Sequence, residues 1–463
     1  MSQTPLNEKP LSLADCLEYA DETKELIIKR NALAEIPPLL EKHFNFENVC
    51  LIADENTYKA AGQKTKTCLL DSGIKIAGAY IFPGEPRLHA DYCFVPLLRE
   101  WISSFRRGVH SPVPIAIGAG TVNDIVKRTS YELKLPYLCV PTAASVDGYT
   151  PNGAALLVDG FKQTLPCTAP AALAADLDVI AQAPSYLSSS GFGDLASKII
   201  SGTDWIIADK AHSLGANGSQ AIDPLAWRMV QISLVDALNA STNAAKGDRE
   251  SINALFQSLA ITGFAMQYMK NSRPVSGSEH LWSHVWEMEN LSMDGVPVTH
   301  GHKVTIGTLA ATAFTEIFFA DPDGPPSPEK NYRRPGTDER RAEVSGAFMD
   351  SLSCLSIIAT ALEKMMDENT IQNINQAFRD SWKEIRDRVL ERLIPYAELK
   401  DLLARAGCPL KPEDIGLSRT KVISDARRAQ MIRDRYGILD LSSDMGNFEK
   451  VLYKMETGDI YLN

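Results

Sequence analysis

The first 180 residues alternate short apolar runs with segments of helical periodicity, and this alternation is the strongest constraint on the fold. Such an order is typical of a parallel β-sheet that helices cover on both faces. Two further apolar runs, at 154–158 and 161–165, are separated by Asp159-Gly160 and predict a hairpin with an Asp-Gly turn. The predicted strands of the parallel sheet are 49–53, 76–81, 114–117, 137–140 and 174–180, and the predicted helices among them are 57–70, 92–105 and 121–131.

After Ala183-Pro184 the pattern changes to long segments with helical periodicity and few β-branched runs. A chain of 463 residues exceeds the usual size of a single hydrophobic core, so we expect two domains. We predict an α/β nucleotide-binding domain at residues 1–185 and an all-α metal-binding and substrate domain at residues 186–463. The Pro- and Gly-rich stretch 321–336 is predicted to be an exposed loop. The predicted helices of the second domain are 194–211, 224–240, 250–271, 305–319, 341–367 and 371–397.

Charge and cysteine content exclude several classes of protein. The formal net charge of −11 argues against a nucleic-acid binder, because no general basic field exists to hold phosphates. The eight cysteines are scattered without a Cys-x-x-Cys pair, which is typical of reduced thiols in a cytosolic protein. The polar N-terminal segment lacks the apolar core of a signal peptide, and no apolar run reaches the length of a membrane span. We therefore expect a soluble cytoplasmic protein that neither binds nucleic acid nor inserts into a membrane.

Four of the eight histidines, His280, His284, His300 and His302, fall within 23 residues. Neutral imidazole plus carboxylate is the ligand set of a catalytic divalent metal, and Asp194 is the candidate carboxylate. His280 and His284 share one face if their segment is helical, and a short polar loop could return His300 to that face. Three protein ligands would leave one metal position open for substrate. The alternative is a chance cluster of histidines on a helical hairpin, with Asp194 an ordinary acidic residue where a helix begins.

Two loops rich in Gly, Ser and Thr follow consecutive predicted strands, at residues 118–121 and 141–149. The first contains Gly118 and Gly120 and leads into a helix, whose N-terminus and backbone amides can bind an anion. In open parallel sheets ligands bind outside the carboxyl ends of the strands, so the two loops together suit a dinucleotide. The first loop departs from the usual dinucleotide fingerprint, because Asn123 stands where that motif has its last glycine. Ordinary turns are the alternative for both loops, with Thr121 and Asp124 forming a helix cap in the first.

Asp54 closes the first predicted strand and has two possible roles. A carboxylate at this position could accept a hydrogen bond from a ribose hydroxyl and would repel a 2′-phosphate, which would favour NAD over NADP. An aspartate cap on the helix that begins near Asn56 explains the residue equally well.

Six segments occur in the order that one family shows, and together they are specific. They are residues 118–127, 141–149, 160–162, 191–198, 276–284 and 300–303. On these segments the chain resembles sn-glycerol-1-phosphate dehydrogenase, within the group that also holds glycerol dehydrogenase, metal-dependent alcohol dehydrogenases and dehydroquinate synthase. The likeness covers residues 20–320 well and continues more weakly to Asp440. It implies a dehydroquinate synthase-like fold, with an α/β domain that binds NAD(P), a helical C-terminal domain and an active site in the cleft between them.

The resemblance also implies roles for individual residues. Asp194, His280 and His300 fall on the family's metal ligands, with Zn²⁺ or Ni²⁺ as the ion. Asp147 and His284 fall on positions that contact substrate, and Asp194 serves both purposes. The implied nucleotide-contacting residues are Gly120, Thr121, Val122, Asn123 and Asp124 in the first loop and Thr142, Ala143, Ala144 and Ser145 in the second. One position departs from the family, since Pro151 replaces a serine that often contacts the nucleotide and lacks both its hydroxyl and its N–H.

The implied activity is the reversible, metal-dependent reduction of dihydroxyacetone phosphate to sn-glycerol 1-phosphate with NADH or NADPH, in a homo-oligomer that we expect to be a dimer. His284 would orient the substrate or relay a proton. The nearest alternative is an alcohol or glycerol dehydrogenase that acts on an unphosphorylated polyol. A lyase like dehydroquinate synthase is less favoured, because that group is expected to carry Glu in place of Asp194. A non-catalytic paralogue that binds metal or nucleotide is the remaining alternative.

Overall fold

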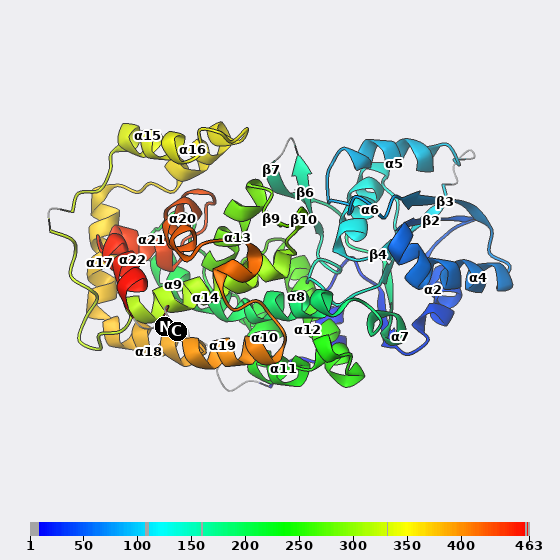
Figure 1. The fold of residues 1–463 in the computed structure, drawn as a ribbon, viewed down its shortest axis with the longest axis horizontal. Helices are drawn as coiled ribbons and strands as arrows, with labels where there is room; N and C mark the ends of the chain where they lie inside the picture. Colours follow the sequence, from blue (N-terminus) through cyan, green and yellow to red (C-terminus); the bar gives the residue numbers. More distant parts are fainter. Residues whose placement is uncertain (1–8, 107–110, 159–160, 331, 459–460, 462–463) are drawn as a thin grey trace. The chain divides into compact units, whose positions relative to one another are not determined.

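The computed structural model describes residues 9–106, 111–158, 161–330, 332–458 and 461. These residues form two compact units, whose elements are labelled in Figure 1. The α/β unit comprises the described residues of Asn7–Leu195 and Arg228–Asn271, and the helical unit comprises those of Ala196–Trp227 and Ser272–Asn463. Residues 228–271 therefore belong to the α/β unit, although they follow residues 196–227 of the helical unit along the chain. The domain boundary between residues 185 and 186 stays a prediction.

The α/β unit is built on a six-stranded sheet with the strand order β1-β8-β5-β4-β2-β3. Every neighbouring pair of strands is parallel, which confirms the parallel sheet that the strand–helix alternation predicted. The strands are β1 (Glu25–Lys29), β2 (Val49–Asp54), β3 (Ile76–Phe82), β4 (Val113–Gly118), β5 (Leu138–Pro141) and β8 (Ala172–Asp176).

The direction in which strands are added to the sheet reverses between β2 and β4. From β2 the chain goes to β3 at one edge, and it then passes back to β4 on the other side of β2. Ligands of open parallel sheets bind at such a switch point, outside the carboxyl ends of the strands. Asp54 ends β2 and Gly118 ends β4, so two predicted nucleotide residues stand at the switch point.

Two layers of helices cover the sheet. Leu51 and Ala53 of β2 face a core that also contains buried residues of α2 (Ile36–His43) and α4 (Gln63–Asp71). The intervening side chains, such as Ile52, point to the other face and are equally buried. There α6 (Gly120–Leu133) packs on β2 and β4, and α5 (Phe94–Ser103) packs on α6. Figure 1 shows α5 and α6 on one side of β2 and β3, and α2 and α4 on the other.

Further elements complete the α/β unit. β6 (Gly153–Val158) and β7 (Phe161–Pro166) form the predicted antiparallel hairpin, although Asp159-Gly160 lie outside the described residues. The remaining helices are α1 (Leu13–Glu18), η1 (Ala32–Glu35), α3 (Glu55–Thr57), the π-helical turn η2 (Tyr58–Gly62), α7 (Leu177–Ile180), α8 (Ser185–Ala196), α10 (Pro224–Val230), α11 (Leu234–Ser241), η3 (Ala244–Lys246) and α12 (Arg249–Met269), of which α8 and α10 extend into the helical unit.

The helical unit contains α9 (Lys198–His212), α13 (Ser278–Met288) and α14 (His300–Phe318), with the short strands β9 (Ser292–Met293) and β10 (Val296–Pro297) between the last two. Its remaining helices are α15 (Thr337–Ala347), α16 (Cys354–Glu363), α17 (Glu368–Asp380), α18 (Trp382–Arg392), α19 (Tyr396–Arg405), η4 (Pro412–Ile415), α20 (Arg419–Met431), α21 (Ile438–Asp444) and α22 (Phe448–Thr457). Within the predicted exposed loop at 321–336, the described residues 321–330 and 332–336 include no helix or strand.

Several predicted element bounds are wrong. The predicted strand 174–180 ends at Asp176, because the Asp176 side chain accepts a hydrogen bond from the Asp178 N–H and starts α7. The predicted helices 224–240, 341–367 and 371–397 are each interrupted. Periodicity alone does not reveal these interruptions, because the helices on either side of each turn keep their own apolar faces. β1 and α2 were not predicted.

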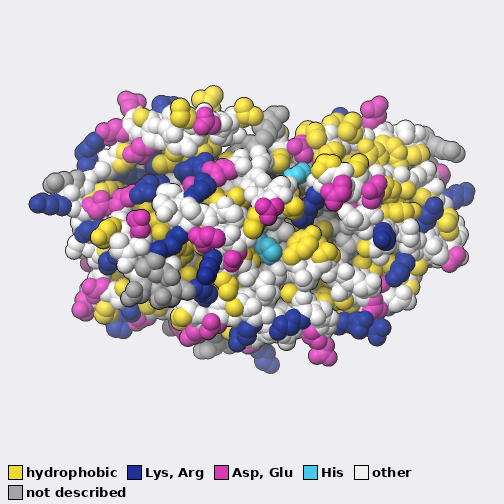
Figure 2. Space-filling view, viewed as in Figure 1, with side chains coloured by type: hydrophobic (Ala, Val, Ile, Leu, Met, Phe, Trp, Pro, Cys, Tyr) yellow, Lys and Arg dark blue, Asp and Glu magenta, His cyan; other side chains and the backbone are white. Residues whose placement is uncertain are grey.

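The surface is that of a mixed-charge protein. Figure 2 shows acidic and basic side chains interspersed over the visible face. Among the described helices, none combines the length and the apolar character that crossing a bilayer requires.

Helix α8 lies directly against the loop that follows β5. A Cβ atom at Gly191 would overlap the carbonyl oxygen of Ala144, and the Ser190 hydroxyl donates to the Ser145 carbonyl at 3.2 Å. A glycine inside a helix costs about 0.5–1 kcal/mol relative to alanine. Close approach of the loop is therefore what requires glycine at this position.

We predict that Gly191→Ala lowers the free energy of unfolding by about 1–3 kcal/mol, because the added methyl group must push α8 away from the loop. Thermal and urea unfolding followed by circular dichroism measure the loss. Gly346→Ala in α15 is the matched control, since no atom lies within 4 Å of a Cβ built there. A Gly191→Ala protein as stable as the control would contradict the packing described here.

Candidate active site

Asp194, His280 and His300 form a group of side chains that could hold a metal ion. Each offers one ligand atom, a carboxylate oxygen or an imidazole nitrogen, and these atoms all lie within 4.8 Å of one another. Asp194 is fully buried and His280 is 6 % exposed. The structure therefore brings together the three residues of the predicted ligand set. Two imidazoles and one carboxylate are the donors of catalytic divalent metals with an open position, so the residues present fit such an ion.

Helix ends carry two of the three candidate ligands. His300 is the first residue of α14, and the preceding Thr299 caps this helix by accepting from the His302 N–H at 3.3 Å. Asp194 lies in the last turn of α8. The prediction that a helix begins near Asp194 is therefore wrong. Gly191 lies inside α8, where the loop after β5 approaches it too closely for a side chain.

His280 and His284 are one turn apart on α13, so their segment is helical, which was the condition for a shared face. The ring centroids of His280 and His300 are 5.3 Å apart, and the His284 ring lies 6.0 Å from His280 and 6.4 Å from His300. His284 thus stands beside the candidate ligands without belonging to the group that could share an ion.

Glu287 connects two of these histidines. Its carboxylate lies 2.7 Å from Nδ1 of His300 and 3.0 Å from Nδ1 of His284, with Nζ of Lys303 at 3.5 Å. Burial alone would raise the pKa of Glu287, but the charge of Lys303 and the contact with His300 hold this pKa well below its usual range. The ionised carboxylate accepts from both Nδ1–H groups, which leaves both Nε2 atoms as lone-pair donors. Metal-binding histidines are oriented in this way.

Glu279 orients His280 by the same principle. One carboxylate oxygen lies 2.7 Å from Nδ1 of His280 and accepts from the Gly277 N–H at 2.8 Å. Burial raises the pKa of Glu279 to about 8. Because this oxygen already accepts from the Gly277 N–H, it acts as an acceptor for the Nδ1–H of His280 as well, which leaves Nε2 of His280 available for an ion.

The environment of His280 and His284 keeps these two imidazoles neutral. Burial, with the nearby charge of Lys198, lowers the pKa of His280 well below its usual range. Burial, with the charge of Arg433, lowers the pKa of His284 to about 4. Neutral imidazole is the form that binds a metal, so the absence of protonation at neutral pH suits the ligand role.

The loop after β5 connects to the candidate carboxylate through its backbone. The Asp147 N–H donates to Oδ2 of Asp194 at 2.9 Å. Two buried side chains of α6 hold this loop: the Asn123 amide donates to the Gly148 carbonyl at 3.0 Å, and Nζ of Lys127 donates to the same carbonyl at 2.8 Å. The first loop's helix therefore fixes the second loop, and the second loop contacts Asp194.

The predicted nucleotide residues differ in how accessible they are. Gly120 and Thr121, at the N-terminus of α6, keep part of their surface exposed. The Thr142 N–H donates to the Gly118 carbonyl at 3.2 Å, and this hydrogen bond joins the two loops. The side-chain amide of Asn123 is already hydrogen-bonded to the Gly148 carbonyl. The residues whose surfaces are buried are Gly118, Val122, Asn123, Thr142, Ala143, Ala144 and Ser145.

The sequence suggests two helix caps, one by Thr121 and Asp124 and one by Asp54, and only the second is present. The predicted cap by Thr121 and Asp124 is wrong, because α6 already begins at Gly120 and has no side-chain cap. Asp124 instead lies 3.6 Å from Nζ of Lys127. The Asp54 carboxylate does cap a helix, accepting from the Thr57 N–H at 2.8 Å. Its contact with a ribose stays a prediction.

The sequence reading missed Glu279 and Glu287. The contact of Glu287 with His284 could have been predicted, because residues three apart on a helix lie on the same face. Glu279 precedes His280 directly, and adjacent helical residues point in different directions, so no local pattern indicates their contact.

Comparisons with known proteins bear on the family and the fold of this chain. Residues 27–184 match the family model described as iron-containing alcohol dehydrogenase. Glycerol-1-phosphate dehydrogenase (NAD(P)+) of Bacillus velezensis is 30% identical over 421 residues, which are 90% of this chain and 90% of that protein. The protein of the same name from Bacillus subtilis is 31% identical over 415 residues, 89% of each chain. The solved structure of sulfoacetaldehyde reductase from Bifidobacterium kashiwanohense in complex with NAD+ shares the fold, with a TM-score of 0.57 at 15% identity over 95% of this chain and 99% of that one.

We predict that Glu287→Gln weakens binding of a divalent metal about 10–100-fold, the usual cost of losing a group that orients a ligand. A glutamine has one acceptor oxygen, so it cannot accept from His284 and His300 through both of its terminal atoms. Competition with a chromophoric chelator measures the dissociation constant.

Glu289→Gln is the control for this substitution. Glu289 lies two residues further on and forms ion pairs with Lys421 and Arg428 on the surface. We expect it to keep the affinity of the unaltered protein. Equal affinities for the two variants would remove Glu287 from the support of the metal centre.

Proposed function

We propose that this chain, which belongs to the glycerol-1-phosphate dehydrogenase family, catalyses the reversible reduction of dihydroxyacetone phosphate to sn-glycerol 1-phosphate with NAD(P)H. The observation that carries the proposal is the group of Asp194, His280 and His300, whose ligand atoms lie close enough to share an ion. Relatives named for this activity match the chain along about nine-tenths of both lengths. Reduction of a ketone by hydride needs a bound nicotinamide and a group that stabilises the oxyanion.

The metal ligands that we propose are Asp194, His280 and His300, with zinc or nickel as the ion. When bound, the ion supplies Lewis-acid stabilisation of the charge that develops on the substrate oxygen. His284 keeps its Nδ1–H on Glu287 and presents Nε2 to the substrate, where it orients a hydroxyl or exchanges a proton. Asp194 and Asp147 complete the proposed substrate contacts.

The nucleotide site that we propose lies at the switch point of the sheet. The partly exposed N-terminus of α6 suits the pyrophosphate, because its free N–H groups and helix dipole favour an anion. Asp54 at the end of β2 suits the ribose. The remaining proposed contacts are Gly118, Gly120, Thr121, Val122, Asn123, Asp124, Thr142, Ala143, Ala144 and Ser145, of which the buried ones would contribute through their backbones. The scattered free cysteines support a cytoplasmic location.

We predict that the purified protein oxidises NADH or NADPH when dihydroxyacetone phosphate is added, that chelation abolishes this activity, and that zinc or nickel restores it. The His280→Ala protein should fold but stay inactive after metal is returned, because one of its three proposed ligands is missing. Absorbance at the nicotinamide band measures turnover, and elemental analysis measures the bound metal.

Parallel assays with dihydroxyacetone distinguish the alternative, an alcohol or glycerol dehydrogenase for an unphosphorylated polyol. Faster turnover of dihydroxyacetone than of its phosphate would favour that alternative. Full metal content and turnover in His280→Ala would show that the proposed ligand set is wrong.

A homodimer is the oligomeric state that we propose. Three large apolar side chains around the turn between α15 and α16 are strongly exposed: Met349 is 75% exposed, Leu352 85% and Leu355 81%. Contiguous exposed apolar surface is typical of protein–protein interfaces. A second copy of the chain is the partner that would cover this surface.

We predict that the double substitution Leu352→Glu and Leu355→Glu converts the dimer to a monomer, because two charges cannot be desolvated at an apolar interface without a large cost. Light scattering coupled to gel filtration measures the mass. Leu70→Glu, at an exposed apolar residue of α4, should leave the mass unchanged. A dimer that persists in the double variant would place the interface elsewhere.

A further inference from the structure

One buried aspartate of α9 caps two other helices at once. Oδ2 of Asp204 accepts from the N–H of Ser278, the first residue of α13, at 2.6 Å. Oδ1 accepts from the N–H of Ile438, the first residue of α21, at 2.8 Å. Asp204 is 2 % exposed. Its two oxygens therefore satisfy N–H groups that are 74 and 234 residues away along the chain.

Neither helix can supply this cap from its own sequence. The residues before the two helices are Gly277 and Gly437, which have no side chain to accept a hydrogen bond. A Cβ atom at Gly277 would lie 2.7 Å from Oδ2 of Asp204, and one at Gly437 would lie 2.8 Å from Oδ1. The backbone at both glycines has negative φ, so space for the carboxylate is what excludes a side chain. The glycines admit Asp204 to both helix ends.

The capped end of α13 is the end that carries the metal ligand. His280 is the third residue of this helix, and Glu279, which orients it, is the second. Carboxylates at a helix N-terminus accept from its free N–H groups and interact favourably with the helix dipole. A change in the position of the first turn of α13 would therefore move His280 and Glu279 together.

The segment before α21 is attached to the same region. The Arg435 guanidinium donates to the Ser272 hydroxyl at 3.0 Å and to the Ser276 carbonyl, in the loop that leads into α13. The Arg273 guanidinium donates to the Tyr436 carbonyl at 2.7 Å. Hydrogen bonds in both directions thus join the loop before α13 to the segment before α21.

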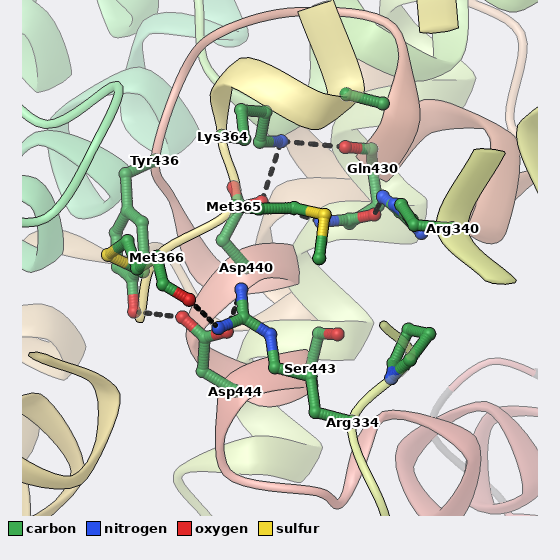
Figure 3. Close-up of a pocket in the computed structure, with 12 residues that line it drawn as sticks. Arg334, Arg340, Lys364, Met365, Met366, Gln430, Tyr436, Asp440, Ser443 and Asp444 are labelled. Atoms are coloured by element: carbon green, nitrogen blue, oxygen red, sulfur yellow. Dashed lines mark hydrogen bonds and ion pairs between the residues drawn. The ribbon is translucent and has the colours of Figure 1, made fainter. Parts of the chain in front are cut away.

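The far side of this segment is held by a buried polar network, which Figure 3 shows. Nζ of Lys364 lies 2.6 Å from Asp440, and the Tyr436 hydroxyl donates to Asp444 at 3.1 Å. Arg334 lies 3.4 Å from Asp444. The contacts of Lys364 and Arg334 attach α21 to the C-terminal end of α16 and to the loop before α15.

We propose that Asp204 is a positioning residue for the metal centre, which fixes the first turn of the histidine helix α13 against the C-terminal segment that contains α21. The inference rests on the proposed metal ligands, His280 above all. It gives the chain beyond residue 430 a function, because α21 and the network around it then support the metal site. Asp204 acts through α13 and contacts no proposed ligand itself.

Asp204→Asn tests this role with little change in size. The amide has one acceptor oxygen, so whichever way it is turned its NH₂ group faces an N–H that Asp204 accepted from. We expect the dissociation constant for Co²⁺ to rise about 10–100-fold, as for other groups that support metal ligands. We also expect the visible absorption bands of bound Co²⁺ to shift, because a displaced His280 changes the coordination geometry.

Asp367→Asn is the matched control. Asp367 caps α17 by accepting from the Thr370 N–H at 3.0 Å, on the surface and on a helix that carries no proposed ligand. Its loss should lower the melting temperature without changing the Co²⁺ affinity or spectrum. All titrations are done well below the melting temperature of each metal-free protein, so a general loss of stability does not enter the comparison.

Gly437→Ala tests the connection from the other side and serves if Asp204→Asn does not fold. It substitutes neither a proposed ligand nor Asp204, but its methyl group must displace the Asp204 carboxylate. We expect weaker Co²⁺ binding, although Gly437 precedes α21, a helix that carries no proposed ligand. Unchanged affinity and spectrum in Gly437→Ala, or in a folded Asp204→Asn, would overturn the inference. Failure of the unaltered protein to bind metal, or metal binding that survives His280→Ala, would instead overturn the proposed ligands.

Discussion

Hydrogen bonds from imidazole N–H groups to buried carboxylates hold the candidate active site in place. Glu287 accepts from His284 and His300, and Glu279 lies against His280. In a site of low polarity such bonds are strong, and removal of one partner leaves a buried polar group unsatisfied. The packing of α13 on α14 serves this arrangement, since a side chain at Gly307 would overlap the backbone of Glu279. The ring nitrogen that each histidine leaves available is therefore set by a glutamate outside the candidate ligand group.

The α/β unit positions its loops by a different means, through backbone carbonyls that accept from buried side chains. Lys127 is wholly buried in α6 and donates to the carbonyls of Gly148 and Gly153, while Asp124 lies near its charge. A buried ammonium group without such partners would be very costly. These hydrogen bonds hold the loop that carries Asp147, although this loop contains no regular secondary structure.

The sequence predicts the parts of this structure that depend on local pattern. Alternating strands and helices predicted the parallel sheet, and the spacing of His280 and His284 predicted one helical face. Edge strand β1 is half-buried, and its apolar run is only Leu26-Ile27-Ile28 between charged residues, which is shorter than the run that predicts a buried strand. The position of Asp194 within α8 is not evident from the sequence, because it depends on the loop after β5, which packs against Gly191 of this helix. Asp204 could not be predicted at all, because both of its partners are distant in sequence and are backbone groups that every residue has.

The hydrogen bond from the Asp147 N–H to Asp194 has a thermodynamic consequence. Asp194 is a candidate ligand, and the Asp147 loop is joined through Thr142 to the turn after β4. Whatever draws the Asp194 carboxylate toward a cation also pulls on the backbone of that loop. If occupancy of one position changes affinity at the other, the effect must be equal in both directions. A nucleotide that tightened cation binding by some factor would itself be bound more tightly, by that same factor, once the cation was present.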